Sequence, residues 1–337
     1  MDNFGPNLDG LDVDYIILKN EERKVKKSAN FIGITFIILM VLPFFLTTML
    51  TNLLRAFGLS SQEAANLLTD PMFLMAAQIF ISILIFILPL GIILYSEHLK
   101  LTDIVSFKKP KKEFFLPIIL MCIGITAFAN IITNLLTTLF NIAGLPVSPP
   151  DFETPKGVLG FIITLLSVAV TPALVEEFSM RGVVQGSLKR YGKGFAIGVS
   201  AILFGMMHGN LSQIPFAFIL GIAIGFAVIK TDSIWTGVII HFINNGVSVV
   251  LDAIATKTEN LQFIGFVNSL YFILCILAFF VGLYLLKGRT RELLDLGEDK
   301  TFTSSLSLRM KWFFGEPTII ISIVVTAIEC VLSLFIY

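Results

Sequence analysis

The stretch GVLGFIITLLSVAVTPALVEEFSMRG, residues 157–182, places a long apolar run directly before three charged side chains. A run of about 20 apolar residues is long enough to cross the ~30 Å hydrocarbon core of a bilayer. Glu176, Glu177 and Arg181 therefore fall inside or beside a membrane helix. Because each ionisable group costs several kcal/mol at bilayer depth, charges at this position indicate a specific role.

The composition of the whole chain also indicates a membrane protein. Of its 337 residues, 55% are hydrophobic and 14% are charged, whereas a soluble globular domain carries about 25% charged residues. The formal net charge is zero, so the composition does not favour nucleic acid as a partner. The three cysteines all fall inside apolar runs and have no metal-ligand spacing, and we expect no disulfide framework.

Nine apolar runs divide the chain. We expect an all-α fold, a polytopic membrane helix bundle with about 8–9 transmembrane helices. The runs lie near residues 31–54, 72–96, 115–143, 157–188, 194–210, 213–229, 233–255, 262–286 and 318–337. The expected organisation is a cytoplasmic N-terminal arm (1–30), a transmembrane bundle (31–286), a cytoplasmic linker (287–317) and an additional C-terminal transmembrane helix (318–337). A short interfacial helix is expected in the linker around LRMKWFF.

Basic residues gather in alternate loops. EERKVKK precedes the first run, FKKPKK follows the second, LKRYGK follows the fourth and LKGRTR follows the eighth, while the loops between these are poor in Lys and Arg. Cytoplasmic loops carry an excess of Lys and Arg, so this alternation predicts a cytoplasmic N-terminus. We expect the protein to lie in the cell (plasma) membrane.

Two further polar clusters interrupt the apolar runs: LFGMMHG, which contains His208, and IIHFINNG, which contains His241. The third histidine, His98, lies in a polar loop. Either intramembrane histidine alone would be explained by a hydrogen bond across a helix interface. Their combination with intramembrane carboxylates favours a shared site.

The depth of these residues supports a single site. Glu176 lies about 15 residues before the basic turn at Tyr191 and His208 about 17 after it, so both lie roughly 22–26 Å along their helices from one cytoplasmic turn. His241 and Asn245 lie roughly 14–20 Å beyond the next cytoplasmic turn. Polar groups on three separate helices therefore reach comparable levels.

Helical spacing suggests a role for each group. Glu177 and Arg181 stand at i, i+4 and can pair on one helix face. The side chain of Glu176 points about 100° away from that of Glu177 around the helix axis and is therefore not part of this pair. A buried carboxylate without a partner is a stronger base. His241 and Asn245, also at i, i+4, can direct an imidazole and an amide toward one developing oxyanion.

This set of groups indicates amide hydrolysis by an activated water. Glu176 and His208 can hold and deprotonate the water, while His241 and Asn245 stabilise the charge on the carbonyl oxygen. The sequence contains no G-x-S-x-G and no H-E-x-x-H, so it offers no motif for a competing serine nucleophile or zinc helix.

The ordered motifs Glu-Glu-x-x-x-Arg, Phe-x-x-x-His and His-x-x-x-Asn resemble those of the CAAX prenyl endopeptidase and bacteriocin-processing (CPBP, Abi) family of intramembrane proteases. The matching residues are Glu176, Glu177 and Arg181, then Phe204 and His208, then His241 and Asn245. The resemblance implies a protease core at about 115–285 and a site that opens toward the cytoplasm. It also implies Glu176 as the base, with Glu177, Arg181 and Phe204 in supporting roles.

The resemblance further implies endoproteolysis near the C-terminus of a lipidated protein or in a peptide precursor such as a bacteriocin. The expected partners are such a substrate and the lipid bilayer. The sequence does not indicate an oligomeric state.

Three alternatives stay open. The first is zinc-dependent hydrolysis with Glu176, His208 and His241 as metal ligands. We favour hydrolysis without a cofactor, because Asn245 would be a poor fourth ligand and is a good oxyanion donor. The second is a non-proteolytic immunity or scaffold protein of the same family. The third is an ion-coupled transporter, although no internal repeat supports it.

Overall fold

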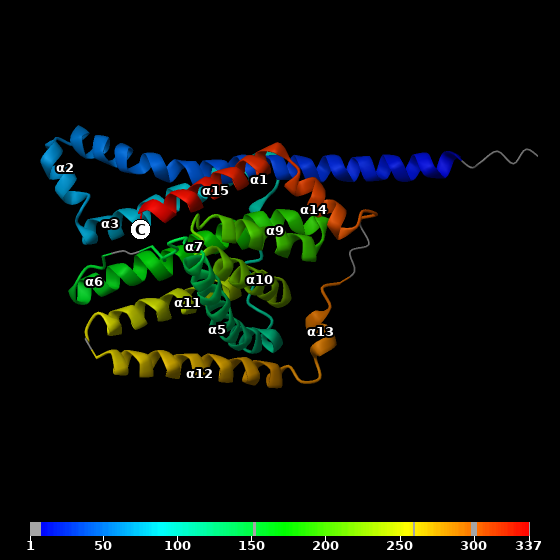
Figure 1. Ribbon diagram of the computed structural model, residues 1–337. Coiled ribbons are helices and arrows are strands. Elements are labelled where there is room, and N and C mark those ends of the chain that lie inside the picture. Colours follow the sequence, from blue (N-terminus) through cyan, green and yellow to red (C-terminus); the bar gives the residue numbers. More distant parts are fainter. Residues whose placement is uncertain (1–7, 151–152, 259, 298–301, 337) are drawn as a thin grey trace, which may run out of the picture.

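The computed structural model describes residues 8–150, 153–258, 260–297 and 302–336 (Figure 1). Within these residues every regular element is a helix. In this described part of the chain, eight helices are long and apolar enough to cross a membrane. The expectation of an all-α bundle is therefore confirmed, and the chain is a multi-pass membrane protein.

The eight long helices match the apolar runs of the sequence. They are α1 (Leu8–Ala56), α3 (Pro71–Ser96), α5 (Lys112–Ile142), the composite span Gly157–Tyr191, α10 (Ile214–Thr231), α11 (Ile234–Ala255), α12 (Leu261–Leu285) and α15 (Pro317–Ile336). The run expected at 194–210 forms α9 (Lys193–Met206), whose 14 residues are about 21 Å long and too short to cross a bilayer. The short connecting helices are α2 (Ser61–Leu67), α4 (Leu101–Ile104), α13 (Thr290–Leu294) and α14 (Leu306–Phe314).

The two polar segments expected outside the bundle are partly helical. From Leu8 onward the N-terminal arm continues without a break into the first span, while residues 1–7 of the arm lie outside the described residues. In the linker, α14 confirms the short helix expected around LRMKWFF, while residues 298–301 lie outside the described part. Phe313 of α14 is fully buried, with its ring centroid 5.9 Å from that of Phe195 in α9, so α14 docks on the bundle.

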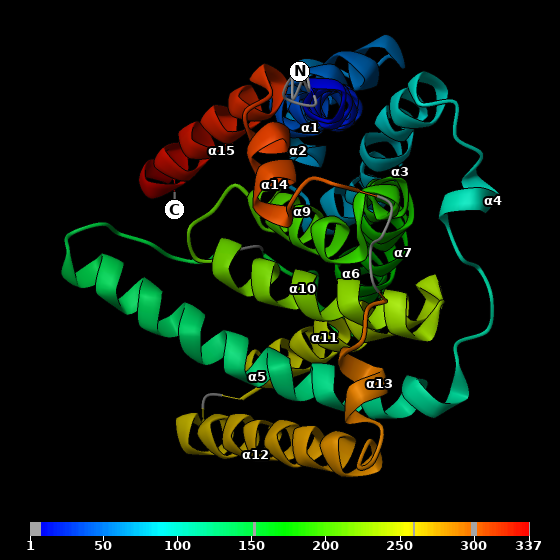
Figure 2. The ribbon, with the colours of Figure 1, turned by 90° about the vertical axis from the view of Figure 1, so that its right-hand side faces the viewer.

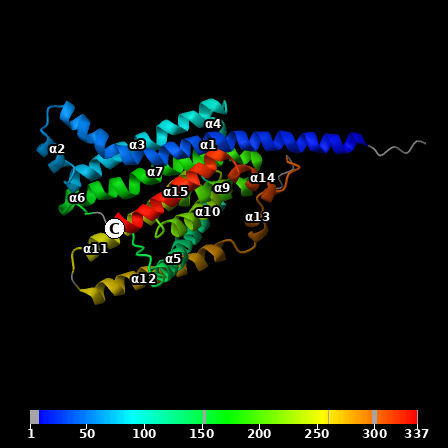
Figure 3. The same cartoon turned by 45° about the horizontal axis from the view of Figure 1, so that its top comes forward.

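The helices pack in layers (Figure 2). At one edge α12 lies along α5, and at the opposite edge α1 packs against α3 and α15. Helices α7, α9, α10 and α11 lie between these edges. The N-terminal part of α1 projects beyond the bundle at the end where α13 and α14 lie (Figure 3). The central helices are therefore enclosed by the outer ones.

The composite span is the least regular helix. It consists of α6 (Gly157–Thr164), the π-helical η1 (Leu165–Val170), α7 (Thr171–Glu177), the π-helical η2 (Phe178–Val184), α8 (Gln185–Leu188) and the 3₁₀ turn η3 (Lys189–Tyr191). Pro172 has no N–H, so the carbonyl of Val168, four residues earlier, lacks its usual α-helical donor. Wider π turns often occur at functional sites, and here they flank the helix α7 that carries both glutamates.

The close approach of α5 and α12 can be tested at Gly124. A Cβ atom added there would lie 2.3 Å from Cβ of Phe279 in α12. We expect Gly124→Val to lower the free energy of unfolding by about 1–3 kcal/mol, because the two helices must separate. In the control, Gly91→Val on α3, an added Cβ meets no atom within 4 Å, and we expect a change below about 0.5 kcal/mol. Equal stabilities of the two variants in detergent unfolding experiments would contradict this packing.

Candidate active site

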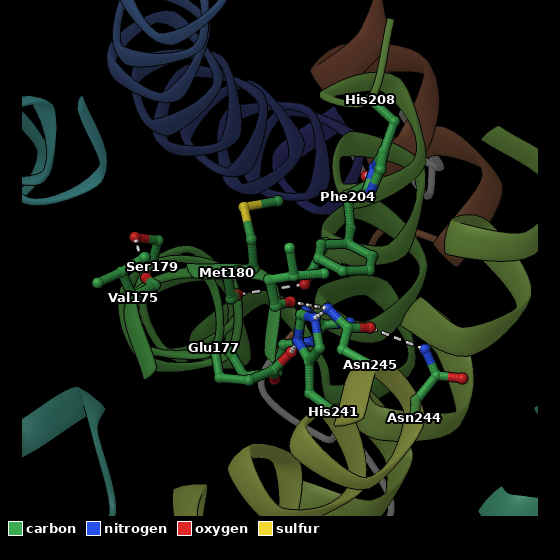
Figure 4. A network of polar contacts seen from close by, with 12 residues as sticks. Val175, Glu177, Ser179, Met180, Phe204, His208, His241, Asn244 and Asn245 are labelled. Atoms are coloured by element: carbon green, nitrogen blue, oxygen red, sulfur yellow. Dashed lines mark hydrogen bonds and ion pairs between the residues drawn. The ribbon is translucent and has the colours of Figure 1, made fainter. Parts of the chain in front are cut away.

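Glu177 joins two helices through one carboxylate oxygen. Its Oε1 accepts a hydrogen bond from Nη1 of Arg181 at 2.8 Å and another from Nδ1–H of His241 at 2.8 Å. The side chains of Glu177 and Arg181 are both 0% exposed. The ion pair expected from the i, i+4 spacing is present, and the same carboxylate also fixes His241 on α11 (Figure 4).

Phe204 brings the third helix, α9, to this cluster. The guanidinium of Arg181 lies 4.0 Å from the centroid of the Phe204 ring, a cation–π contact. The same ring meets His208 edge-on at 5.3 Å and His241 at 5.9 Å between centroids. Phe204 is 2% exposed, so its ring covers the ion pair and separates the two imidazoles.

His241 and Asn245 face each other on α11. Nδ2 of Asn245 lies 3.2 Å from Nε2 of His241 and donates to the carbonyl of Val168 at 2.9 Å. That carbonyl is the one that Pro172 leaves without its usual donor. The side-chain oxygen of Asn245 accepts from Asn244 at 2.9 Å, so the amide is held from both ends.

His208 lies just after the end of α9. Its Nδ1–H donates to the carbonyl of Phe204 at 2.8 Å, which leaves the lone pair on Nε2. The residue also lines a cavity of about 440 Å³ whose other walls include α1, α3 and α15. His208 therefore links the buried cluster to an open space.

Glu176 is half-buried and makes no hydrogen bond or ion pair with another of the described residues. It lies within electrostatic range of His241, Glu177 and Arg181. No hydrogen bond or ion pair joins it to His208 in the part of the chain that the structure describes. Of the two adjacent glutamates, Glu177 is held through Oε1 by Arg181 and His241, whereas Glu176 has no such partner among the described residues.

The residues proposed as zinc ligands do not form a metal site as they are arranged. Among the described residues no three His, Cys, Asp or Glu side chains gather around one point. Nδ1 of His241 is directed at Glu177 and its Nε2 faces Asn245. Zinc binding would require this hydrogen-bonded pair to separate.

Two features of the site were not predicted from the sequence. Glu177 was expected to pair with Arg181 alone, and its contact with His241 joins residues far apart in the chain. The carbonyl of Val168 as a partner of Asn245 was also missed. The signal for it was Pro172, because a proline inside an apolar run frees a backbone acceptor four residues earlier.

Residues 158–247 match the family model of the type II CAAX prenyl endopeptidases, described as Rce1-like. The match runs from α6 to α11 and includes all seven predicted site residues. The membrane-embedded CAAX protease MroQ of Staphylococcus aureus (strain USA300) is 26% identical over 169 residues, which cover 47% of this chain and 68% of the relative. No solved structure matches the chain.

The buried ion pair makes a prediction about stability. Arg181→Met should lower the free energy of unfolding by about 3–5 kcal/mol, because it leaves the carboxylate of Glu177 buried without its cation. Adding Glu177→Gln to this variant should restore part of the loss, because the buried charge is then removed. Unfolding of the single and double variants in detergent measures both effects.

The exposed pair of Lys26 and Glu22, 2.6 Å apart, provides the control. Lys26→Met should cost less than about 1 kcal/mol. If Arg181→Met cost no more than this control, Glu177 would not carry a buried charge that depends on Arg181.

Proposed function

We propose that this chain hydrolyses its substrate with a water molecule that Glu176 and His208 activate. The chain belongs to the CAAX prenyl endopeptidase and bacteriocin-processing family through its Rce1-like domain, and it is an intramembrane peptidase. The proposed substrates are peptide bonds near the C-terminus of lipidated proteins or in peptide precursors. The observation that carries this mechanism is the difference in bonding between the two adjacent glutamates. Glu177 is held by Arg181 and His241, whereas Glu176 has no partner among the described residues.

Glu176 acts as the general base in this mechanism. Its carboxylate takes a proton from water as the water oxygen forms a bond to the carbonyl carbon of the peptide. Nε2 of His208, which carries a lone pair, accepts a hydrogen bond from the second O–H of the water and so positions it. When the carbon–nitrogen bond breaks, the protonated Glu176 returns its proton to the leaving amine. The products are a carboxylate and a free amine.

His241 and Asn245 stabilise the negative charge on the former carbonyl oxygen. Their Nε2 and Nδ2 atoms are 3.2 Å apart, so one oxygen can contact both. One N–H of Asn245 stays on the carbonyl of Val168 and the other turns to the oxyanion. His241 donates from Nε2 when both of its nitrogens carry protons, and Glu177 then balances the charge.

The basic loops support an orientation with the N-terminus in the cytoplasm and a site that opens toward that side of the plasma membrane. Hydrogen bonds link Glu177 to Arg181 and His241, and the ring of Phe204 contacts both His241 and His208 (Figure 4). A transporter would instead need polar groups along a path across the bilayer. A peptidase site fits the clustered arrangement.

Substitution of the base tests the mechanism. Glu176→Gln should lower kcat for cleavage of a lipidated or leader-bearing peptide by about 10²–10⁴-fold, because the amide cannot accept the proton from water. Asn245→Ala should lower kcat by about 10²–10³-fold through loss of one oxyanion donor. Cleavage is measured after reconstitution into liposomes.

The matched control is Glu22→Gln, which makes the same substitution at a partly exposed position of α1. It should cleave like the wild type. A Glu176→Gln enzyme that retained activity within twofold of this control would remove Glu176 from the mechanism.

Metal removal tests the alternative with zinc. We expect cleavage to persist after exhaustive chelation and dialysis, and elemental analysis to find no stoichiometric metal in the active protein, because the mechanism uses a carboxylate and an imidazole only. Loss of activity on chelation, with recovery on addition of Zn²⁺, would establish the zinc-dependent alternative instead.

A further inference from the structure

Glu329 is an ionisable side chain inside the last membrane span that the proposed mechanism does not use. It lies in α15, beyond the segment that matches the Rce1-like domain. A carboxylate in a membrane span is costly unless it meets a partner or serves a function. Glu329 makes no hydrogen bond or ion pair with another of the described residues. The part of the chain that the structure describes therefore offers Glu329 no counter-charge.

The carboxylate of Glu329 lies beside Gly209, the residue that follows His208. Glu329 and His208 both line the cavity of about 440 Å³. A Cβ atom added at Gly209 would lie only 2.7 Å from Oε2 of Glu329, so the carboxylate lies against the backbone just after His208. Gly209 also has a φ of +57°, a backbone conformation that residues with a side chain rarely adopt. The turn after α9 thus brings the cavity, the carboxylate and one of the proposed water-binding residues together.

The rest of the cavity wall is mainly apolar. Its apolar side chains include Leu39, Met40, Phe44, Ile85, Phe86 and Leu332. Two of its polar side chains are already engaged, since Asn210 accepts from Ser212 and Ser333 donates to the carbonyl of Cys330. Among the described residues that line the cavity, only Glu329 is an acid, and no lysine or arginine is present to balance it.

We propose that this cavity is the subsite for a basic side chain of the substrate, lysine or arginine, and that Glu329 is the residue that selects it. The inference rests on the proposed peptidase function. Lysine and arginine carry an aliphatic stem that suits the apolar wall and a cationic head that pairs with the carboxylate. Because His208 belongs both to the cavity and to the catalytic cluster, the selected residue lies close to the scissile bond.

A lipid chain or a neutral side chain fits this cavity less well. Either would cover the apolar wall but would leave the carboxylate without a counter-charge in a desolvated space. A cationic side chain satisfies both parts of the cavity. A comparison of charged and neutral occupants therefore distinguishes a basic side chain from a lipid chain or a neutral side chain.

The test measures binding without cleavage. Fluorescent apolar peptides that differ at one residue, lysine or norleucine, are titrated against the full-length Glu176→Gln protein in detergent micelles, with the lysine moved stepwise through the residues that flank the bond. At one position we expect lysine to lower Kd by about tenfold relative to norleucine. Glu329→Gln, added to the same protein, should reduce this preference to less than about twofold.

Glu316→Gln is the matched control, because Glu316 lies just before α15 and outside the cavity. It should keep the full preference for lysine. Equal binding of lysine and norleucine peptides at every position would overturn the proposal, and so would a lysine preference that survives Glu329→Gln.

A second measurement needs no substitution at Glu329. Carbodiimide treatment of the complex should form an amide bond between the side-chain amine of the peptide lysine and Glu329, which mass spectrometry can map. The same peptide with acetyl-lysine should give no such product. Cross-links to other carboxylates only would contradict the proposal. If the wild-type protein binds with the charge preference but does not cleave, the proposed function fails while the subsite stands.

Discussion

The site depends on one carboxylate oxygen. Oε1 of Glu177 receives hydrogen bonds from Arg181 and His241, both at 2.8 Å, in a space from which water is excluded. Removing such charges from water is expensive, and a buried ion pair often contributes little net stability. Oε2 of Glu177 and Nε and Nη2 of Arg181 are buried without hydrogen-bond partners among the described atoms. The pair is therefore better understood as a device that fixes positions, and its main consequence is a defined orientation of His241.

The irregular backbone of the composite span serves the same end. Pro172 leaves the carbonyl of Val168 available, and Asn245 uses it as an anchor. The π-helical segments lie directly before and after α7, the helix that carries both glutamates. The early end of α9 places His208 at the margin of the buried cluster and at the wall of a cavity. Pro172 thus contributes a free backbone acceptor to the site, and the early end of α9 places His208 where the site meets the cavity.

Much of this arrangement could be predicted from the sequence. Apolar length predicted the spans, since a bilayer demands it, and the i, i+4 spacing predicted the pairing of Glu177 and Arg181. The similar depths of Glu176, His208 and His241 indicated that three helices share one site, and the structure places two of these residues around Phe204. The contact of Glu177 with His241 was out of reach, because it depends on how α7 and α11 rotate when they pack. The cavity beside Glu329 was out of reach for the same reason, because its walls come from both ends of the chain.

Glu177 holds His241 through Nδ1, whereas Glu176 has no partner among the described residues. Nitrogen-15 NMR of the imidazole of His241, in protein labelled at histidine, tests this arrangement most directly because it locates the proton. We expect Nδ1 of His241 to be protonated in the wild type, and we expect its signal to move in Glu177→Gln while the signal of His208 stays in place. A His241 that carries its proton on Nε2 alone would contradict this arrangement.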